Sequence, residues 1–180
     1  RQKGLEASSA LLDEVGLPAE NPPMRWLGLD LGSKTIGIAC ADPLGYTAQP
    51  LETWRRTGSR QADLDHLRHL VRVHDVGGIL VGLPLDGDGR VGRQAKKTLE
   101  FVAQLRRALG LPVQTWDERF STVAVERVLL AGDVSRRRRK QVVDKLAAAY
   151  VLQGFLDAGC PVTLEPPEPE PPRAPAGKAG

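Results

Sequence analysis

The chain has 180 residues, of which 41% are hydrophobic and 26% charged, and its formal net charge is +3. These values are typical of one soluble globular domain with tails, and no stretch approaches the ~20 apolar residues that a membrane span requires. Only two cysteines occur, without Cys/His zinc spacing, which argues against a disulfide scaffold or a zinc site. We therefore expect a cytoplasmic protein, and any bound metal to have oxygen ligands, which favours Mg²⁺ or Mn²⁺.

The two ends of the chain differ from its middle. Residues 1–23 show no sustained period and end in a Pro-Pro pair directly before the single methionine, Met24. Residues 165–180 are dominated by Pro, Glu, Ala and Gly, which cannot bury enough surface to fold. We expect an N-terminal extension over 1–23, a folded domain over 24–164 and a Pro-rich disordered tail over 165–180. Because both ends are net acidic, the basic surplus lies in the folded domain and suits a polyanionic partner.

Short apolar runs predict the first part of the fold. Residues 26–30 and 35–40 read as two strands joined by the turn 32–34, and an extended segment near 46–53 completes a meander. The following pattern alternates: a helix over 61–74, a strand over 78–82, a helix over 91–109, a strand over 112–116 and helices over 123–131 and 141–156. Strands in a meander, followed by alternating helices and strands, predict an α/β fold: a mixed five-stranded sheet with helices on both faces.

Three acidic residues stand where predicted elements begin or end. Asp30 ends an apolar strand, Glu118 follows the strand 112–116, and Asp144 lies near the start of the last helix. The small stretch Ala147–Ala149 would let that helix approach the sheet closely. Carboxylates converging there would form an oxygen-ligand site for one or two divalent cations, which can activate water and stabilise the leaving oxygen in phosphodiester cleavage.

Each acidic residue also has a plain structural interpretation. Asp30 fits a turn or a cap on a backbone amide, and Asp144 fits a first-turn carboxylate interacting with the helix dipole. Glu118 fits a surface ion pair with Arg119. The joint placement of the three residues, rather than any one of them, favours the metal site.

Four sequence blocks resemble, in order, the YqgF-type family, whose members are described as Holliday junction resolvases and as pre-16S rRNA nucleases. The blocks are Asp30–Ala39, Val81–Leu85 with the glycine-containing loop after it, Asp117–Thr122 and Asp144–Ala149. Together they span essentially the whole folded part, and four blocks in order are far more specific than one. The resemblance implies a ribonuclease H-like fold, a divalent metal, nucleic-acid cleavage, and catalytic and metal-ligating roles for Asp30, Glu118 and Asp144.

One departure affects the number of metal ions. Related junction resolvases carry two acidic residues on the final helix, whereas Gln141 and Ala147 stand three residues before and after Asp144. Only one carboxylate is therefore available on that face, and both one and two metal ions remain open.

Basic residues near the acidic ones are the expected phosphate ligands. A run of five cations precedes Asp144: Arg136, Arg137, Arg138, Arg139 and Lys140. Such a run is often a solvated face, but this position favours phosphate binding, which weakens as salt rises. Lys34 and Arg119 are expected to act similarly. The cluster of Trp54, Arg55, Arg56 and Arg60 either binds nucleic acid or simply covers the core.

The resemblance ranks 5′-end maturation of pre-16S rRNA first, by a metal-dependent hydrolase. The alternative is a Holliday junction resolvase acting on branched DNA in recombination and repair, for which a two-fold homodimer is expected. A function of another class, nucleic-acid binding without cleavage, is disfavoured by the three acidic residues Asp30, Glu118 and Asp144. An actin-like or sugar-kinase ATPase shares the Asp-x-Gly turn, but the folded part is too short for the second domain that it needs.

Overall fold

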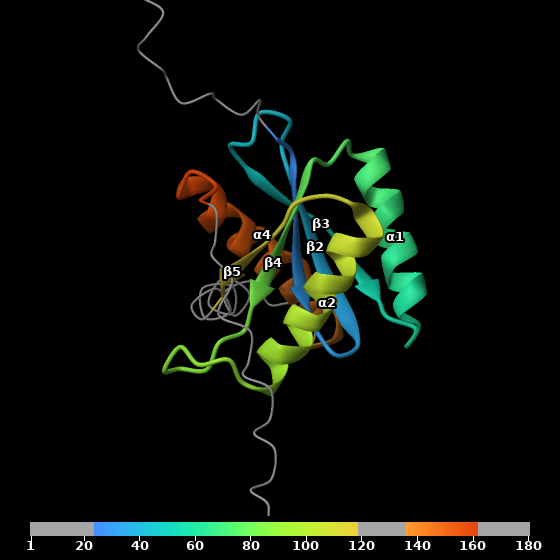
Figure 1. Ribbon diagram of the computed structural model, residues 1–180, viewed down its shortest axis with the longest axis vertical. Coiled ribbons are helices and arrows are strands. Elements are labelled where there is room, and N and C mark those ends of the chain that lie inside the picture. Colours follow the sequence, from blue (N-terminus) through green and yellow to red (C-terminus); the bar gives the residue numbers. More distant parts are fainter. Residues whose placement is uncertain (1–23, 119–135, 162–180) are drawn as a thin grey trace, which may run out of the picture.

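A computed structural model describes residues 24–118 and 136–161, without the side chains of 136–141. Five strands form one sheet, and helices cover both of its faces (Figure 1). The strands are β1 (Trp26–Leu31), β2 (Thr35–Ala41), β3 (Ala48–Arg55), β4 (Gly78–Leu83) and β5 (Val113–Asp117), and the helices are α1 (Arg60–Val73), α2 (Arg93–Leu109) and α4 (Arg136–Asp157). None of these helices has the length and apolar character needed to cross a membrane.

The sheet is mixed, in the order β3-β2-β1-β4-β5. β1 and β3 each run antiparallel to β2, whereas β1, β4 and β5 run parallel to one another. The predicted meander and five-stranded mixed sheet are therefore confirmed. Because parallel strands end at the same edge of a sheet, the carboxyl ends of β1, β4 and β5 meet at the lower end of the molecule in Figure 1.

Two separate hydrophobic cores lie on the two faces of the sheet. On one face, Leu27 and Leu29 of β1 pack with Leu67 of α1 and Phe101 of α2. On the other face, Trp26 packs with residues of α4, including the fully buried Phe155, whose ring centroid lies 4.8 Å from that of Trp26. Full burial of such a side chain stabilises the fold by about 1.5–3 kcal/mol. Alternation along β1 therefore directs odd-numbered residues toward α1 and α2, and even-numbered residues toward α4.

Two glycines allow α4 to lie directly against the sheet. A Cβ on Gly28 would come within 2.8 Å of the Leu152 Cβ, and a Cβ on Gly37 would overlap the backbone carbonyl of Asp144. Strand glycines often mark such a close backbone approach. The buried alanines 147–149 complete the contact, as their small size predicts. Asp144 is thereby brought over β2.

The last helix differs from its prediction. It begins at Arg136 rather than at 141, so Asp144 lies about two turns inside α4 and the first turn contains no acidic residue. The dipole interpretation of Asp144 is therefore wrong. The cause is that arginine and lysine are good helix formers, so the basic run continues the helix without an apolar period. The predicted helix 123–131, the extension 1–23 and the tail 165–180 lie outside the described residues.

Candidate active site

Asp30 is the penultimate residue of β1 and, by alternation, is on the α4 side of the sheet. Its Cα is in register with Gly37 of the neighbouring strand. The pKa of Asp30 is raised to about 6, mainly by burial and then by the negative charge of Asp144, while a hydrogen bond with Glu118 lowers it. A carboxyl whose pKa is raised to about 6 titrates well above the ordinary range of an aspartate, which marks a candidate functional group.

Glu118 follows β5 and is held over the end of β4. Its backbone amide donates to the carbonyl of Leu83 at 3.4 Å. A Cβ on Gly82 would overlap Oε2 of Glu118, so a larger residue at this position would require the carboxylate to shift. The pKa of Glu118 is raised to about 8, mainly by burial and then by the charge of Asp30, the hydrogen bond with Asp30 and the charge of Asp117.

Asp144 reaches the same region from α4. The hydroxyl of Thr35, the first residue of β2, donates to Asp144 Oδ2 at 2.6 Å and fixes one of its oxygens. The effect of its charge on the pKa of Asp30 shows that the two carboxylates lie near each other. The structure thus brings all three predicted acidic residues to the carboxyl edge of the parallel strands.

The three carboxylates are not equally close. Asp30 and Glu118 are joined by a hydrogen bond, so that between pH 6 and 8 the pair holds about one proton. Asp144 is near but bonded to Thr35, and within residues 24–118 and 136–161 no three Asp, Glu, His or Cys side chains form a ready metal cage. The donors are nevertheless all carboxylate oxygens, which suit a hard divalent cation, and their mutual repulsion is what a cation relieves.

The sequence interpretation missed the residues that position these carboxylates. Thr35, Gly37 and Gly82 touch or make room for Asp144 and Glu118. The signal in the sequence was glycine inside otherwise apolar strands, which indicates a bulge or a close approach.

Comparison with known proteins adds the family. The family model described as Holliday junction resolvase matches residues 24–158, about three quarters of the chain. The chain belongs to this family. The predicted resemblance is confirmed, and the mixed five-stranded sheet with helices on both faces agrees with the predicted α/β fold class.

Relatives within the family are similar over nearly their full length. A protein of Halalkalibacterium halodurans named "Putative pre-16S rRNA nuclease" is 52% identical over 135 residues, 74% of this chain and 96% of the relative. Proteins of the same name from Desulforamulus reducens and Moorella thermoacetica are 50% and 53% identical over 76% and 74% of this chain, and 98% and 95% of the relatives. The solved structure of Thermus thermophilus RuvC with a Holliday junction substrate has a TM-score of 0.48 at 17% identity, covering 76% of this chain and 97% of RuvC.

Of the predicted phosphate ligands, the structure describes the side chain of Lys34, which is exposed in the β1–β2 turn. Arg119 and the side chains of Arg136–Lys140 lie outside the described part, although the backbone of the run forms the start of α4. Arg56 has a structural role: its Nε donates to Asp63 at 2.8 Å and its Nη1 to the carbonyl of Gly32 at 3.0 Å. It therefore fastens the turn that follows Asp30 to α1.

Proposed function

We propose that this protein is a divalent-metal-dependent nuclease that hydrolyses phosphodiester bonds, with Asp30, Glu118 and Asp144 as its catalytic and metal-ligating carboxylates. The observation that carries the proposal is the hydrogen-bonded pair of Asp30 and Glu118, half-buried, with Asp144 beside it at the edge where three parallel strands end. Carboxylates gathered without a compensating cation are costly, and such clusters occur at functional sites.

Mg²⁺ or Mn²⁺ fits the donor set, and when bound it would activate water and stabilise the charge that develops on the phosphate oxygens. Asp30 and Glu118 would hold it once the shared proton has left, because a protonated carboxyl oxygen is a poor ligand. Thr35 donates to Oδ2 of Asp144, an arrangement in which the second oxygen would serve as the metal ligand. Gly82 keeps space for Glu118. Activity is therefore expected to rise as pH passes through about 8, where the pair loses its remaining proton.

We propose pre-16S rRNA as the substrate, with 5′-end maturation during ribosome biogenesis in the cytoplasm as the process. Three relatives at 50% identity or more carry the pre-16S rRNA nuclease name. The second candidate, cleavage of branched DNA by a homodimer, is favoured by the description of the family itself. Both substrates are polyanions and suit the basic folded domain.

A cleavage assay tests the proposal. The purified full chain is incubated with Mn²⁺ or Mg²⁺ on two labelled substrates: a precursor 16S rRNA leader and a four-way DNA junction. Asp30→Asn should abolish cleavage, whereas Asp65→Asn, an equal charge change on an exposed residue of α1, should leave it intact. Preferential RNA cleavage supports rRNA maturation, and paired symmetric nicks in the junction support the resolvase. If neither substrate is cut with either metal, the nuclease proposal fails.

A further inference from the structure

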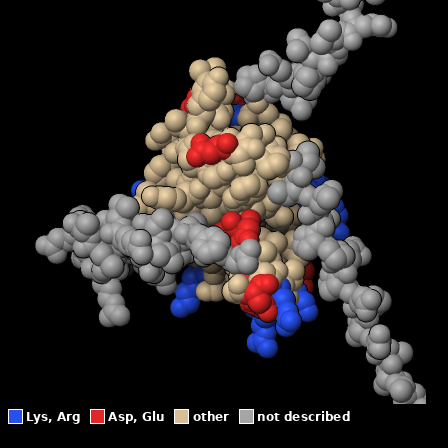
Figure 2. Space-filling model, turned by 90° about the vertical axis from the view of Figure 1, so that its left-hand side faces the viewer, with Lys and Arg blue, Asp and Glu red and all other residues tan. Residues whose placement is uncertain are grey.

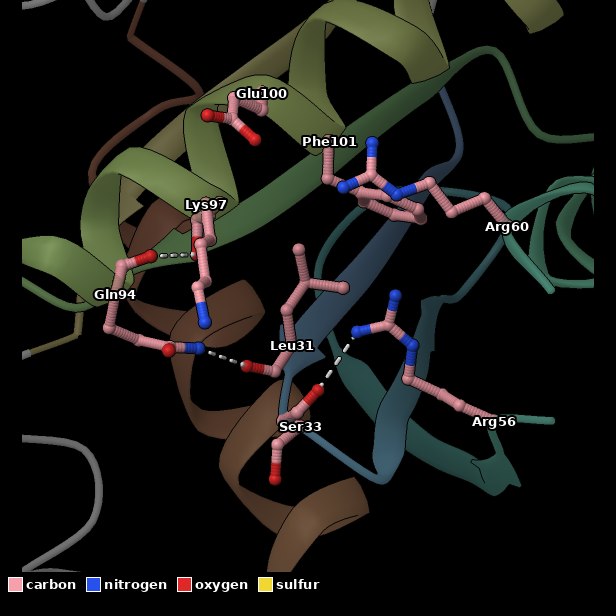
Figure 3. Close-up of a pocket in the computed structure, with 10 residues that line it drawn as sticks. Leu31, Ser33, Arg56, Arg60, Gln94, Lys97, Glu100 and Phe101 are labelled. Carbon is pink, nitrogen blue, oxygen red and sulfur yellow. Dashed lines mark hydrogen bonds between the residues drawn. The ribbon is translucent and has the colours of Figure 1, made fainter. Parts of the chain in front are cut away.

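A cavity of about 380 Å³ lies on the opposite side of the β1–β2 turn from the carboxylates. Leu31 directly follows Asp30 in β1 but is on the α1 and α2 side of the sheet, where it lines the cavity with Gly32 and Ser33. The other walls come from the end of β3, the start of α1 and the first half of α2 (Figure 3). One strand end thus contributes to two different sites on the two faces of the sheet.

At one wall of this cavity, the charge of Arg56 is paired with a carboxylate. Arg56 is bonded to Asp63, which is 1% exposed, and to the carbonyl of Gly32. The Arg56 guanidinium carbon also lies 5.6 Å from the centre of the Phe101 ring, within the range of a cation–π contact. These contacts fix the shape of the turn and the cavity wall rather than leaving Arg56 free for a ligand.

The rim of the cavity has two cations of a different kind. Arg60 and Lys97 are exposed, and within the described part of the chain neither takes part in an ion pair or a side-chain hydrogen bond. Figure 3 shows the Lys97 amine directed into the cavity, and Arg60 extending across it toward Phe101. Glu100 is the acidic member of the lining, and its carboxylate points away from the Lys97 amine. The rim therefore presents two cations that form no ion pair within the described part, against one carboxylate, that of Glu100.

We propose that this cavity is a phosphate-binding subsite for the nucleic-acid strand that is cut at the carboxylates on the other side of the β1–β2 turn. Arg60 and Lys97 would bind a backbone phosphate of that strand. The inference rests on the proposed nuclease function. At about 30 Å³ per water molecule the cavity holds about a dozen waters, which is enough for a phosphate with its attached sugar. Phosphates recognised by arginine and lysine are the main source of affinity in nucleic-acid binding.

The position of the cavity explains why the ligand is part of a strand. Lys34 is exposed in the turn that separates the cavity from Asp30, so cationic groups follow one another from the carboxylates across the turn to the rim. Figure 2 shows lysine and arginine side chains gathered at the lower end of the body, the end at which Figure 1 places the β1–β2 turn and the start of α2. A strand that leaves the carboxylates over the turn therefore meets the cavity next.

The test measures binding without cleavage. Affinity of the full chain for a labelled single-stranded RNA oligonucleotide is measured by fluorescence anisotropy in EDTA at several salt concentrations. The variant Arg60→Gln/Lys97→Gln should bind about tenfold more weakly, and the slope of log affinity against log salt should fall by about 0.7 for each lost phosphate contact. The matched control is Lys96→Gln/Arg107→Gln: both residues are exposed on α2 away from the cavity, and the change in net charge is the same. The control should lose no more than about twofold, and thermal unfolding should show that both variants fold.

Two further arms separate the alternatives. Inorganic phosphate and a nucleoside monophosphate are titrated into the wild type and the cavity variant; if the cavity variant loses only these ligands and binds RNA like the control, the cavity serves a free nucleotide and the proposal is overturned. Equal loss of RNA affinity in the cavity and control variants also overturns it, as does a wild type that binds no RNA. Because binding is measured in EDTA, selective loss in the cavity variant supports the subsite even if no substrate is ever cut, in which case the nuclease proposal alone fails.

Discussion

The two faces of the sheet carry opposite charges at the same strand end. On the α4 face, Asp30, Glu118 and Asp144 crowd together, and their repulsion and burial raise the pKa values of Asp30 and Glu118. On the α1 and α2 face, the cavity is lined by three cations, Arg56, Arg60 and Lys97, against the single carboxylate of Glu100, and Arg56 is paired with Asp63. Each face has an excess of one sign that the protein itself does not neutralise. This difference agrees with the two proposals: a divalent cation would bind the acidic face, and a phosphate of the nucleic-acid strand would bind the basic face.

The largest expected effect is on kcat, and it distinguishes the acidic face from the basic face, where a substitution should change KM instead. Asp30→Asn should lower kcat by about 10³-fold, equivalent to about 4 kcal/mol, because it removes a proposed ligand of the catalytic metal. Its affinity for RNA in EDTA should be unchanged or slightly tighter, since a negative charge near the phosphates is lost. Arg60→Gln/Lys97→Gln should instead raise KM and leave kcat within about threefold. Single-turnover and steady-state cleavage with Mn²⁺ measure both values. A loss of less than tenfold for Asp30→Asn contradicts the assignment of that residue.

The close packing of α4 predicts the next largest effect, and it concerns the acidic face alone. Gly37→Ala should destabilise the fold by about 3 kcal/mol, because the added Cβ overlaps the backbone of Asp144 and must push α4 away from the sheet. Chemical denaturation measures the change in the free energy of unfolding. Gly154→Ala is the matched control: it lies in α4, its Cβ would stay 3.4 Å from Trp116 Nε1, and helix propensity favours alanine by about 1 kcal/mol. Similar stability in both variants would show that the α4 backbone at Asp144 does not pack directly against Gly37.

These packing contacts mark the limit of what the sequence could predict. Apolar runs ending in Asp30 and before Glu118 were enough to place both residues at the edge of the sheet, because strand direction follows from the alternation of helices and strands. The sequence did not show that Gly82 lies against the Glu118 carboxylate, or that Asp30 and Glu118 share a proton. Both facts depend on distances between strands that are separated by a helix or more along the chain. No periodicity encodes that distance.

The cavity on the other face could not be predicted from the sequence, for a related reason. Its lining comes from three separate segments, the β1–β2 turn, the region of 56–60 and α2, and no local pattern shows that they meet. The sequence left the arginines near Trp54 open between nucleic-acid binding and core cover. The structure divides them by their contacts: Arg56 is bonded to Asp63 and Gly32, and Arg60 stands free at the rim within the described part.

Removal of the shared proton gives a pH-dependent prediction for the acidic face. The folded-state pKa of Glu118 is raised from 4.5 to about 8, so its contribution to stability is present below pH 4.5 and is lost as pH rises through 8. Glu118→Gln cannot ionise, so it should be more stable than wild type by about 2 kcal/mol at pH 9, with a much smaller difference at pH 5. Thermal unfolding across this range measures the difference. Mn²⁺ should stabilise the wild type at pH 9 more than the variant, since only the wild type keeps all three carboxylates.

Asp42, whose pKa is lowered rather than raised, provides the control for this pH profile. Hydrogen bonds from backbone amides, led by that of Thr47, lower the pKa of Asp42. The stability that this carboxylate contributes is present above its unfolded pKa and is lost as pH falls. Asp42→Asn should therefore destabilise the protein at neutral pH, and the difference should shrink in acid. If Glu118→Gln shows the same profile as Asp42→Asn, the repulsion assigned to the acidic face is absent.

The smallest expected effect tests whether Asp144 is oriented as well as placed. Thr35→Val preserves the shape of the side chain but removes the 2.6 Å hydrogen bond to Asp144 Oδ2, so it should cost about 1 kcal/mol of stability. If the bond orients the carboxylate for the metal, cleavage should also require a several-fold higher Mn²⁺ concentration, and Thr35→Ser should restore the wild-type requirement. A merely structural bond would lower stability without moving the metal requirement. Since the change leaves Arg60 and Lys97 untouched, RNA affinity in EDTA should stay at the wild-type value, and a loss there would mean that the two faces are not independent.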